Sequence, residues 1–145
     1  MDFPNILIAS LTAGILTQLF KFVNEARHGK IKWNILNSYG GMPSAHTAFV
    51  AGLSTAVGIS EGLASAEFAI AFILSLLIAR DAIGFRRYLG THGRVINMLT
   101  RELPDGEELK YPLQLRERIG HTPLEAAVGA LVGIGVSAAY YVFIF

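Results

Sequence analysis

The chain has 145 residues, of which 52% are hydrophobic and 16% charged, and its formal net charge is +1. The length suits one domain, and the charged fraction lies well below the roughly 25% that is usual in soluble domains, so the composition points to a membrane protein. The absence of cysteine excludes disulfides, thiolate catalysis and cysteine-ligated metals.

Four apolar stretches are typical of helices in a membrane bundle. They cover residues 5–22, 44–59, 63–79 and 124–145. A spanning helix needs about 20 residues, within a range of about 17–25, and the first, third and fourth stretches meet this requirement. The second stretch has 16 residues, so it either spans with help from its neighbours or forms a re-entrant or buried core helix. We expect an all-α integral membrane bundle of about four transmembrane helices, with residues 1–145 as a single membrane-embedded domain.

Two of these stretches carry small residues at every fourth position. The two sets are Ala48, Gly52 and Ala56, and Gly129, Gly133 and Ser137. Such faces let helices approach closely in a bilayer, either within the fold or between protomers of a homo-oligomer.

The basic residues are strongly segregated along the chain. All twelve lysines and arginines lie in residues 21–43 and 80–123, and both termini lack them. With four spans, the two basic connections lie on the same side of the membrane, whereas three spans would separate them. The positive-inside rule makes that side cytoplasmic and places both termini on the opposite side of a cell inner or organelle membrane.

The second basic connection, residues 80–123, is too long to be featureless in a compact domain. Its apolar positions predict a short amphipathic helix over residues 91–102, on the membrane surface or covering a site. A turn is expected at 104–108, and residues 111–119 lead to the last helix.

The turn at residues 40–43 leads into the second apolar stretch. Its glycines and proline favour a turn, and Ser44 is placed to cap the helix that follows. A helix start of this kind presents backbone N–H groups to an anion, and His46 lies in its first turn. An ordinary capped helix start with an interfacial histidine remains the alternative at this point.

The last apolar stretch begins with a complete capping box. Thr122 and Glu125 stand three residues apart, with proline at the first helical position. Glu125 therefore has a structural role as a cap. It also follows His121 by four residues, so its carboxylate could instead hold one imidazole nitrogen and leave the other free to act as a base or nucleophile.

The four-helix topology brings several charged and titratable residues together at one end of the bundle. They are Lys21, His46, Asp81, Arg86, Arg87, His121 and Glu125. The cations favour an anion such as phosphate and oppose a bound metal, so no metal and no cofactor are expected. Nucleic acid is not expected as a partner, because the basic residues lie against a bilayer without an aromatic platform.

Three segments carry a resemblance to a known family, together with Lys21. They are residues 40–47, 81–87 and 120–125. With them the chain resembles the type 2 phosphatidic acid phosphatase and vanadium haloperoxidase superfamily, and most closely its small divergent membrane branch.

The resemblance implies a phosphatase that forms a phosphohistidine without a metal. It implies that His121 is the nucleophile, Glu125 the carboxylate that orients it, and His46 the general acid. Ser44 with neighbouring N–H groups would bind phosphate, and Lys21 and Arg27 would stand for the first motif.

The chain departs from the superfamily pattern at several positions. Arg27 follows Lys21 after five residues instead of six and lacks the proline after it, Ala45 replaces a glycine, and Leu115 stands where an arginine is expected. The final acid is glutamate instead of aspartate. We expect Arg86 or Arg87 to supply the missing phosphate contact, with Asp81 paired to one of them.

The expected function is a membrane phosphatase for a phosphomonoester lipid, of the phosphatidylglycerol phosphate or phosphatidic acid type, at the cytoplasmic face. The alternative is a non-catalytic protein of the same fold that binds anionic lipids or assembles a membrane complex. A transporter or channel is disfavoured because no apolar stretch carries a charge at mid-span.

Overall fold

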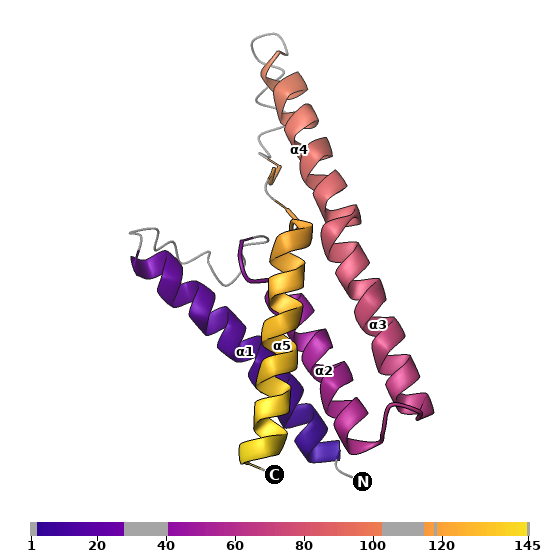
Figure 1. The fold of residues 1–145 in the computed structure, drawn as a ribbon. Helices are drawn as coiled ribbons and strands as arrows, with labels where there is room; N and C mark the ends of the chain where they lie inside the picture. The colour runs from indigo at the N-terminus through magenta and orange to yellow at the C-terminus, as the bar shows by residue number, and fades with distance from the viewer. Residues whose placement is uncertain (1–2, 28–40, 103–114, 118, 145) are drawn as a thin grey trace.

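The computed structural model describes residues 3–27, 41–102, 115–117 and 119–144. These residues form five α-helices: α1 (Phe3–Arg27), α2 (Ala45–Ser60), α3 (Ala66–Ile83), α4 (Phe85–Arg101) and α5 (Pro123–Phe143). No strand occurs in the described ranges, so the expected all-α class is confirmed. Helices α1 and α3 run in one direction and α2 and α5 in the other, with both termini at the same end of the bundle (Figure 1).

Three helical runs are long and apolar enough to cross a membrane. They are Phe3–Asn24, Ala66–Arg101 and Pro123–Phe143. Helix α2 has 16 residues, a length of about 24 Å at the usual rise per residue. It packs against α1, α3 and α5, and its buried residues lie along its whole length. The helices are consistent with a membrane bundle, and α2 is its central helix.

The small residues of α2 and α5 bring these two helices into direct backbone contact. A side chain at Gly129 would collide with the Ser44 carbonyl, and one at Gly133 with the Ala48 carbonyl. Lower in the interface, the Ser137 hydroxyl donates a hydrogen bond of 2.9 Å to the Gly52 carbonyl. The two small-residue faces thus meet within one chain.

Hydroxyl groups join α3 to α2 in the apolar part of the bundle. The Ser75 hydroxyl lies 2.7 Å from that of Ser54 and 2.7 Å from the Val50 carbonyl. Hydroxyl bonds between helices are a common link where no water competes. These hydroxyl contacts hold α3 in the bundle, although most of its large apolar side chains are exposed.

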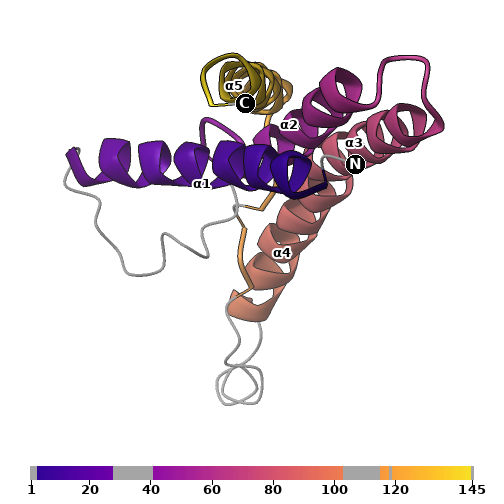
Figure 2. The same ribbon diagram turned by 90° about the horizontal axis from the view of Figure 1, so that it is seen from below.

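The amphipathic helix is longer than the sequence predicts. Helix α4 begins at Phe85, six residues before the predicted start at Thr91, and follows α3 after the single residue Gly84. The sequence places Arg86 and Arg87 at the end of the third apolar helix, whereas they lie in the first turn of α4, and apolar residues continue at helical spacing from Phe85. Figures 1 and 2 show α4 extending beyond the other helices.

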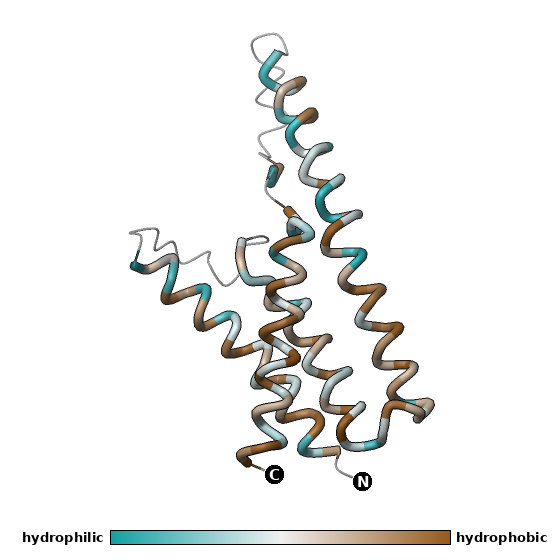
Figure 3. Tube along the Cα trace, viewed as in Figure 1, coloured by the Kyte–Doolittle hydropathy of each residue, from teal (hydrophilic) through white to brown (hydrophobic). Residues whose placement is uncertain are grey.

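Hydrophilic residues gather toward the end of the molecule opposite the termini, in α4 and in the last turns of α1 (Figure 3). The candidate functional residues also belong to this end. The expected turn at 104–108, and most of the segment 111–119, lie outside the described residues.

Candidate functional site

Backbone hydrogen bonds hold three helix ends together at the polar end of the bundle. The Ser44 N–H donates to the Glu125 carbonyl over 3.1 Å, which joins the start of α2 to the start of α5. The His121 N–H donates to the Ala82 carbonyl over 2.9 Å, which joins the residue before α5 to the end of α3. The two histidines therefore come from segments whose backbones are fixed relative to each other.

The start of α2 is built by Gly41 and Ser44. Gly41 has a φ of 88°, a conformation that side chains rarely tolerate. The Ser44 hydroxyl accepts the Thr47 N–H at 3.4 Å and the Thr47 hydroxyl at 3.0 Å, so the expected N-cap forms. Ser44 is completely buried, whereas His46 in the first turn is exposed.

The start of α5 combines the two roles considered for Glu125. Its Oε2 accepts the Thr122 N–H at 2.9 Å, and the Thr122 hydroxyl accepts the Glu125 N–H at 3.2 Å, which completes the capping box. The same Oε2 lies 3.3 Å from His121 Nδ1. This second contact does not have the geometry of a hydrogen bond, so it is electrostatic. One carboxylate oxygen therefore both caps the helix and faces the imidazole.

His121 is buried, with 7% of its surface exposed. Burial lowers its pKa below the usual value, and the positive charge of Lys21 acts in the same direction. Glu125 and the Gly41 backbone oppose this shift in pKa but do not reverse it. His121 is therefore neutral near pH 7, and a proton on Nδ1 toward Glu125 would leave Nε2 with a free electron pair.

His46 shares its surroundings with His121. Arg86, His121, Lys21 and Asp81 all act electrostatically on it. Lys21 is only 4% exposed despite its charge, and it acts on both histidines.

Arg86 is held by Asp81, the pairing expected for one of the two arginines. Its Nε lies 2.7 Å from Asp81 Oδ2, and both side chains are partly exposed. This contact uses Nε and leaves the terminal guanidinium nitrogens of Arg86 available for an anion.

Two predicted phosphate ligands are not brought to the two histidines in the described structure. Arg27 lies six residues beyond Lys21, about 9 Å further along the helix, and α1 leans away from α5 in this part (Figure 1). The Arg87 side chain is exposed; its backbone N–H group faces Gly120. Ser44 is close to the site, but its hydroxyl is occupied by the helix cap.

No cluster of three His, Asp or Glu side chains that could hold a metal occurs in the described residues. The arrangement instead offers one neutral buried imidazole, one exposed imidazole, a carboxylate and two nearby cations. This set of groups can bind an anion and move protons on either side of it.

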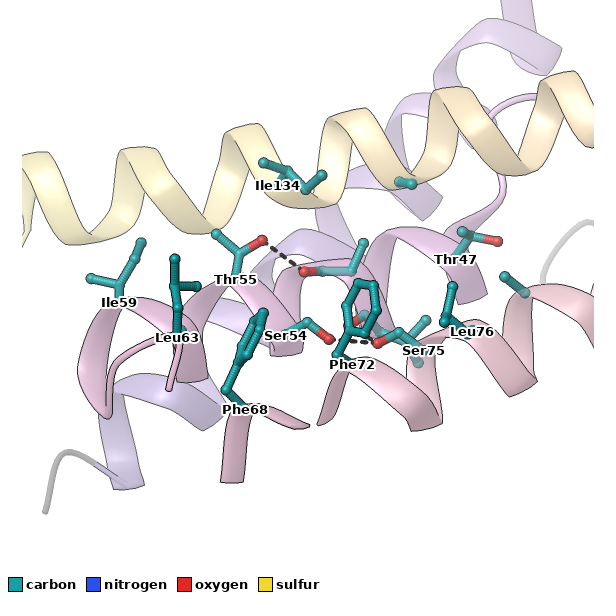
Figure 4. A pocket seen from close by; sticks show the side chains of 15 residues that line it. Thr47, Ser54, Thr55, Ile59, Leu63, Phe68, Phe72, Ser75, Leu76 and Ile134 are labelled. Atoms are coloured by element: carbon teal, nitrogen blue, oxygen red, sulfur yellow. Dashed lines mark hydrogen bonds between the residues drawn. The ribbon is translucent and has the colours of Figure 1, made fainter. Parts of the chain in front are cut away.

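Two apolar grooves follow α2. One, of about 590 Å³, lies between α1, α2 and α3; its only polar side chains are Gln18 and His46. The other, of about 510 Å³, lies between α2, α3 and α5. Figure 4 shows the second groove, with Phe68, Phe72 and Ile134 on its walls and without any of the candidate site residues. The first groove therefore leads to the site and the second does not.

One contact of the site was missed by the sequence analysis. Asn97 of α4 binds the segment that precedes His121, and Gly90 and Gly93 lie on the same face of α4. The spacing of these three residues, three and then four apart, is a helical-face pattern that could have been noticed.

Comparison with known proteins bears on this arrangement. A family model described as the divergent PAP2 family matches residues 4–136. The chain belongs to the divergent PAP2 family. It is also 36% identical, over 144 residues, to an uncharacterized membrane protein, YuiD, of Bacillus subtilis (strain 168), and the match covers 92% of this chain and 90% of that protein. No solved structure matches the chain.

The membership confirms the resemblance drawn from residues 40–47, 81–87 and 120–125. It extends over nearly all of the described helices, from α1 to the last third of α5. This member of the divergent PAP2 family is an all-helical bundle in its described residues, with three helical runs long and apolar enough to cross a membrane.

Proposed function

We propose that this divergent PAP2 protein is a metal-independent phosphatase for a phosphomonoester lipid, and that residues 1–145 form one catalytic domain. The observation that carries the proposal is the meeting of His46 and His121 beside Lys21, Arg86 and Glu125. These residues come from α1, α2, α4 and the start of α5, so their convergence is a property of the tertiary structure.

The reaction follows from the state of the two histidines. Nε2 of neutral His121 attacks phosphorus, an N–P bond forms, and the ester P–O bond breaks. His46 gives its proton to the leaving alkoxide. Water then attacks the phosphohistidine while His46 takes a proton from that water, which releases phosphate and restores both residues. Lys21 and Arg86 stabilise the negative charge on the phosphoryl oxygens in both steps.

The structure also supports roles for Glu125, Ser44 and Asp81. Glu125 faces Nδ1 of His121 and favours the tautomer with Nε2 free. Ser44 caps α2 and so orients the first-turn N–H groups of Ala45 and His46, which have no helical acceptor and can contact phosphate. Asp81 holds Arg86. Arg27 and Arg87 would contribute only after a movement of their side chains.

The groove that ends at His46 supports a lipid rather than a soluble phosphate ester. It runs from the charged site into the apolar part of the bundle between α1, α2 and α3. An amphiphile fits this arrangement, with its phosphate at the helix ends and an acyl chain in the groove. We infer that the site faces the cytoplasm, which would give access to lipids of the phosphatidic acid or phosphatidylglycerol phosphate type.

The test is phosphate release by purified protein in detergent micelles that contain phosphatidic acid or phosphatidylglycerol phosphate. We expect release from at least one of them in the presence of a metal chelator, and a loss of about 10³-fold or more in His121→Ala. A panel without any His121-dependent release would overturn the proposal.

A non-catalytic lipid-binding role is the second candidate, and one observation favours it. Leu115, where the superfamily expects an arginine, has an uncharged and exposed side chain, and its backbone is bound to Asn97 of α4. Binding of anionic lipid that depends on Arg86 but not on His121, without phosphate release, would support this second candidate.

A further inference from the structure

The segment before His121 is attached to α4 over its whole described length. We call residues 115–117 and 119–121 the strap. Figure 1 shows it running beside α4 toward the start of α5. It has no regular secondary structure, so its course depends on contacts with the helix.

Asn97 makes the main side-chain contact with the strap. Its Nδ2 donates to the Leu115 carbonyl at 2.8 Å, and its Oδ1 accepts the Leu115 N–H at 2.9 Å. Nδ2 also donates to Glu117 Oε1 at 3.0 Å. An asparagine amide can satisfy both backbone groups of one residue at once, because it carries a donor and an acceptor side by side.

Two glycines of α4 let the strap lie directly on the helix. A side chain at Gly90 would come within 2.5 Å of the Glu117 carbonyl, and one at Gly93 within 2.8 Å of the Arg116 carbonyl. At the far end, Gly120 has a φ of 94°, and a side chain there would meet the Arg87 N–H group at 2.7 Å. The described residues of the strap are therefore closely packed against α4 both at 115–117 and at 119–120.

Glu117 adds a charged contact to this path. Its Oε2 lies 3.5 Å from Arg94 Nε on α4. At the end of the strap, the His121 N–H bonds the Ala82 carbonyl. His121 is thus held on one side by α3 and on the other by a segment that α4 holds in place.

We propose that Asn97 is a positioning residue for His121, acting through the strap. The expected effect on catalysis rests on the proposed function, whereas the expected effect on the position of His121 does not. The hydrogen bonds of Asn97 are to Leu115 and Glu117 of the strap and not to either histidine. By holding these residues on α4, Asn97 determines the position of the His121 imidazole at the end of the strap. Gly90 and Gly93 form the surface of α4 on which the strap lies.

The test uses the full chain in detergent micelles, with two variants and a matched control for each. Asn97→Ala removes the amide, and Thr100→Ala removes a polar group whose bond stays within α4, to the Ile96 carbonyl. Gly90→Ala places a methyl group against the strap, and Gly135→Ala adds the same group to α5 where no atom lies within 4 Å.

The first measurement is the titration of His121 by NMR with labelled histidine, assigned with His121→Ala. In the wild type we expect its pKa below the usual value, because the ring is buried. In Asn97→Ala and Gly90→Ala we expect the pKa to move toward the usual value of about 6.5, because the ring gains water. Amide hydrogen exchange should rise in residues 115–121 in these two variants and in neither control.

The second measurement is phosphate release from phosphatidic acid or phosphatidylglycerol phosphate. We expect Asn97→Ala and Gly90→Ala to lower kcat by about 10²-fold, as misplacement of a reacting group does, while KM changes less than about twofold. The controls should match the wild type.

The outcomes separate the two proposals. If the wild type releases no phosphate but Asn97→Ala changes the His121 titration, the proposed function fails and the positioning role stands. If the His121 titration and the hydrogen exchange are the same in wild type and Asn97→Ala, the positioning role is wrong, whatever the activity.

Discussion

At the scale of single residues, the site depends on groups that serve two purposes. Glu125 Oε2 caps α5 and faces His121 at the same time. Asp81 lies near His46 and binds Arg86. These second contacts restrict the rotation of the Glu125 and Asp81 side chains, because each carboxylate also binds a group that takes no part in proton transfer.

The two arginines after α3 should differ in their effect on catalysis. We expect Arg86→Ala to lower kcat/KM by about 10²–10³-fold, as loss of one charge-stabilising donor commonly does. Arg87→Ala should have a much smaller effect, because its side chain is exposed and only its backbone lies at Gly120. Steady-state phosphate release with each variant checks this, and equal turnover by both variants and the wild type would contradict a phosphate-binding role for either arginine.

The pH dependence of kcat/KM should report His121. Activity requires the neutral imidazole, so it should fall on the acid side as His121 becomes protonated, at a pH below about 6.5, because burial lowers the pKa of His121. Glu125 raises this pKa. Replacing it by glutamine, which preserves the capping box, should therefore lower the pKa of His121 further and move the acid limb to lower pH.

The measurement is the pH profile of kcat/KM for wild type and Glu125→Gln. A lower maximal rate is also expected, because an uncharged amide does not stabilise the positive charge that His121 gains when its Nε2 bonds to phosphorus. An acid limb that moves to higher pH in Glu125→Gln would show that His121 is not the group that titrates.

At the scale of helices, α2 organises the molecule because its small residues allow three neighbours to approach. Gly52 lies so close to α1 that a Cβ atom at position 52 would come within 2.9 Å of the Ala13 Cβ. The α2–α5 contact brings Ser44 against Gly129. This contact determines the position of His46 relative to His121 along the helix axes. Helix α3 contacts mainly α2, which leaves grooves on both sides of it.

The groove between α1, α2 and α3 should accommodate an acyl chain of the substrate. Gly14 lines it, and an added side chain there would first meet Phe49, at 3.3 Å. We expect Gly14→Leu to raise KM for a long-chain phosphatidic acid about tenfold, because it fills the groove, and to leave KM for a dihexanoyl phosphatidic acid within about twofold. Each CH₂ group that loses its apolar contact costs about 0.8 kcal/mol, so two of them suffice for this effect.

Ala139→Leu is the control, because Ala139 is exposed on α5 and lines neither groove. Kinetic constants for both substrates with all three proteins decide the question. Equal changes for the long and the short substrate in Gly14→Leu would mean that the groove does not hold the chain.

At the scale of the whole molecule, the polar end with the candidate site and the opposite end with both termini are separated by apolar helix surface (Figures 1 and 3). In the described part of the chain, the basic residues lie in the second half of α1, at the end of α3, in α4 and in residues 115–117. If the positive-inside rule applies, the site faces the cytoplasm. This assignment is a proposal about how the bundle sits in a cell.

The chain is well suited to a test of orientation because it contains no cysteine. We expect Glu61→Cys, in the turn before α3, to react with a membrane-impermeant maleimide on intact cells. Thr91→Cys, on the exposed part of α4, should react only after the membrane is permeabilised. Both residues are exposed. The reverse labelling pattern would place the site on the outer side.

Local patterns in the sequence determined the class of the protein and most of its helices. The apolar stretches at 5–22, 63–79 and 124–145 correspond to α1, α3 and α5, because a hydrophobic run of spanning length has few alternatives to a helix in a bilayer. The caps at Ser44 and Thr122 were also predictable, since an N-cap is decided by residues within one turn.

Only the tertiary structure decided which distant residues meet. The small-residue faces of α2 and α5 could have served an oligomer, and the Gly129–Ser44 and Gly133–Ala48 contacts settle that they pack within one chain. The strap on Asn97 depends on contacts over 18 residues and more, and the helical spacing of Gly90, Gly93 and Asn97 does not by itself say which segment covers that face. The two histidines were expected at one end of the bundle, but the burial of His121 and the exposure of His46 follow from helix packing, because that packing determines which of two similar side chains loses its water.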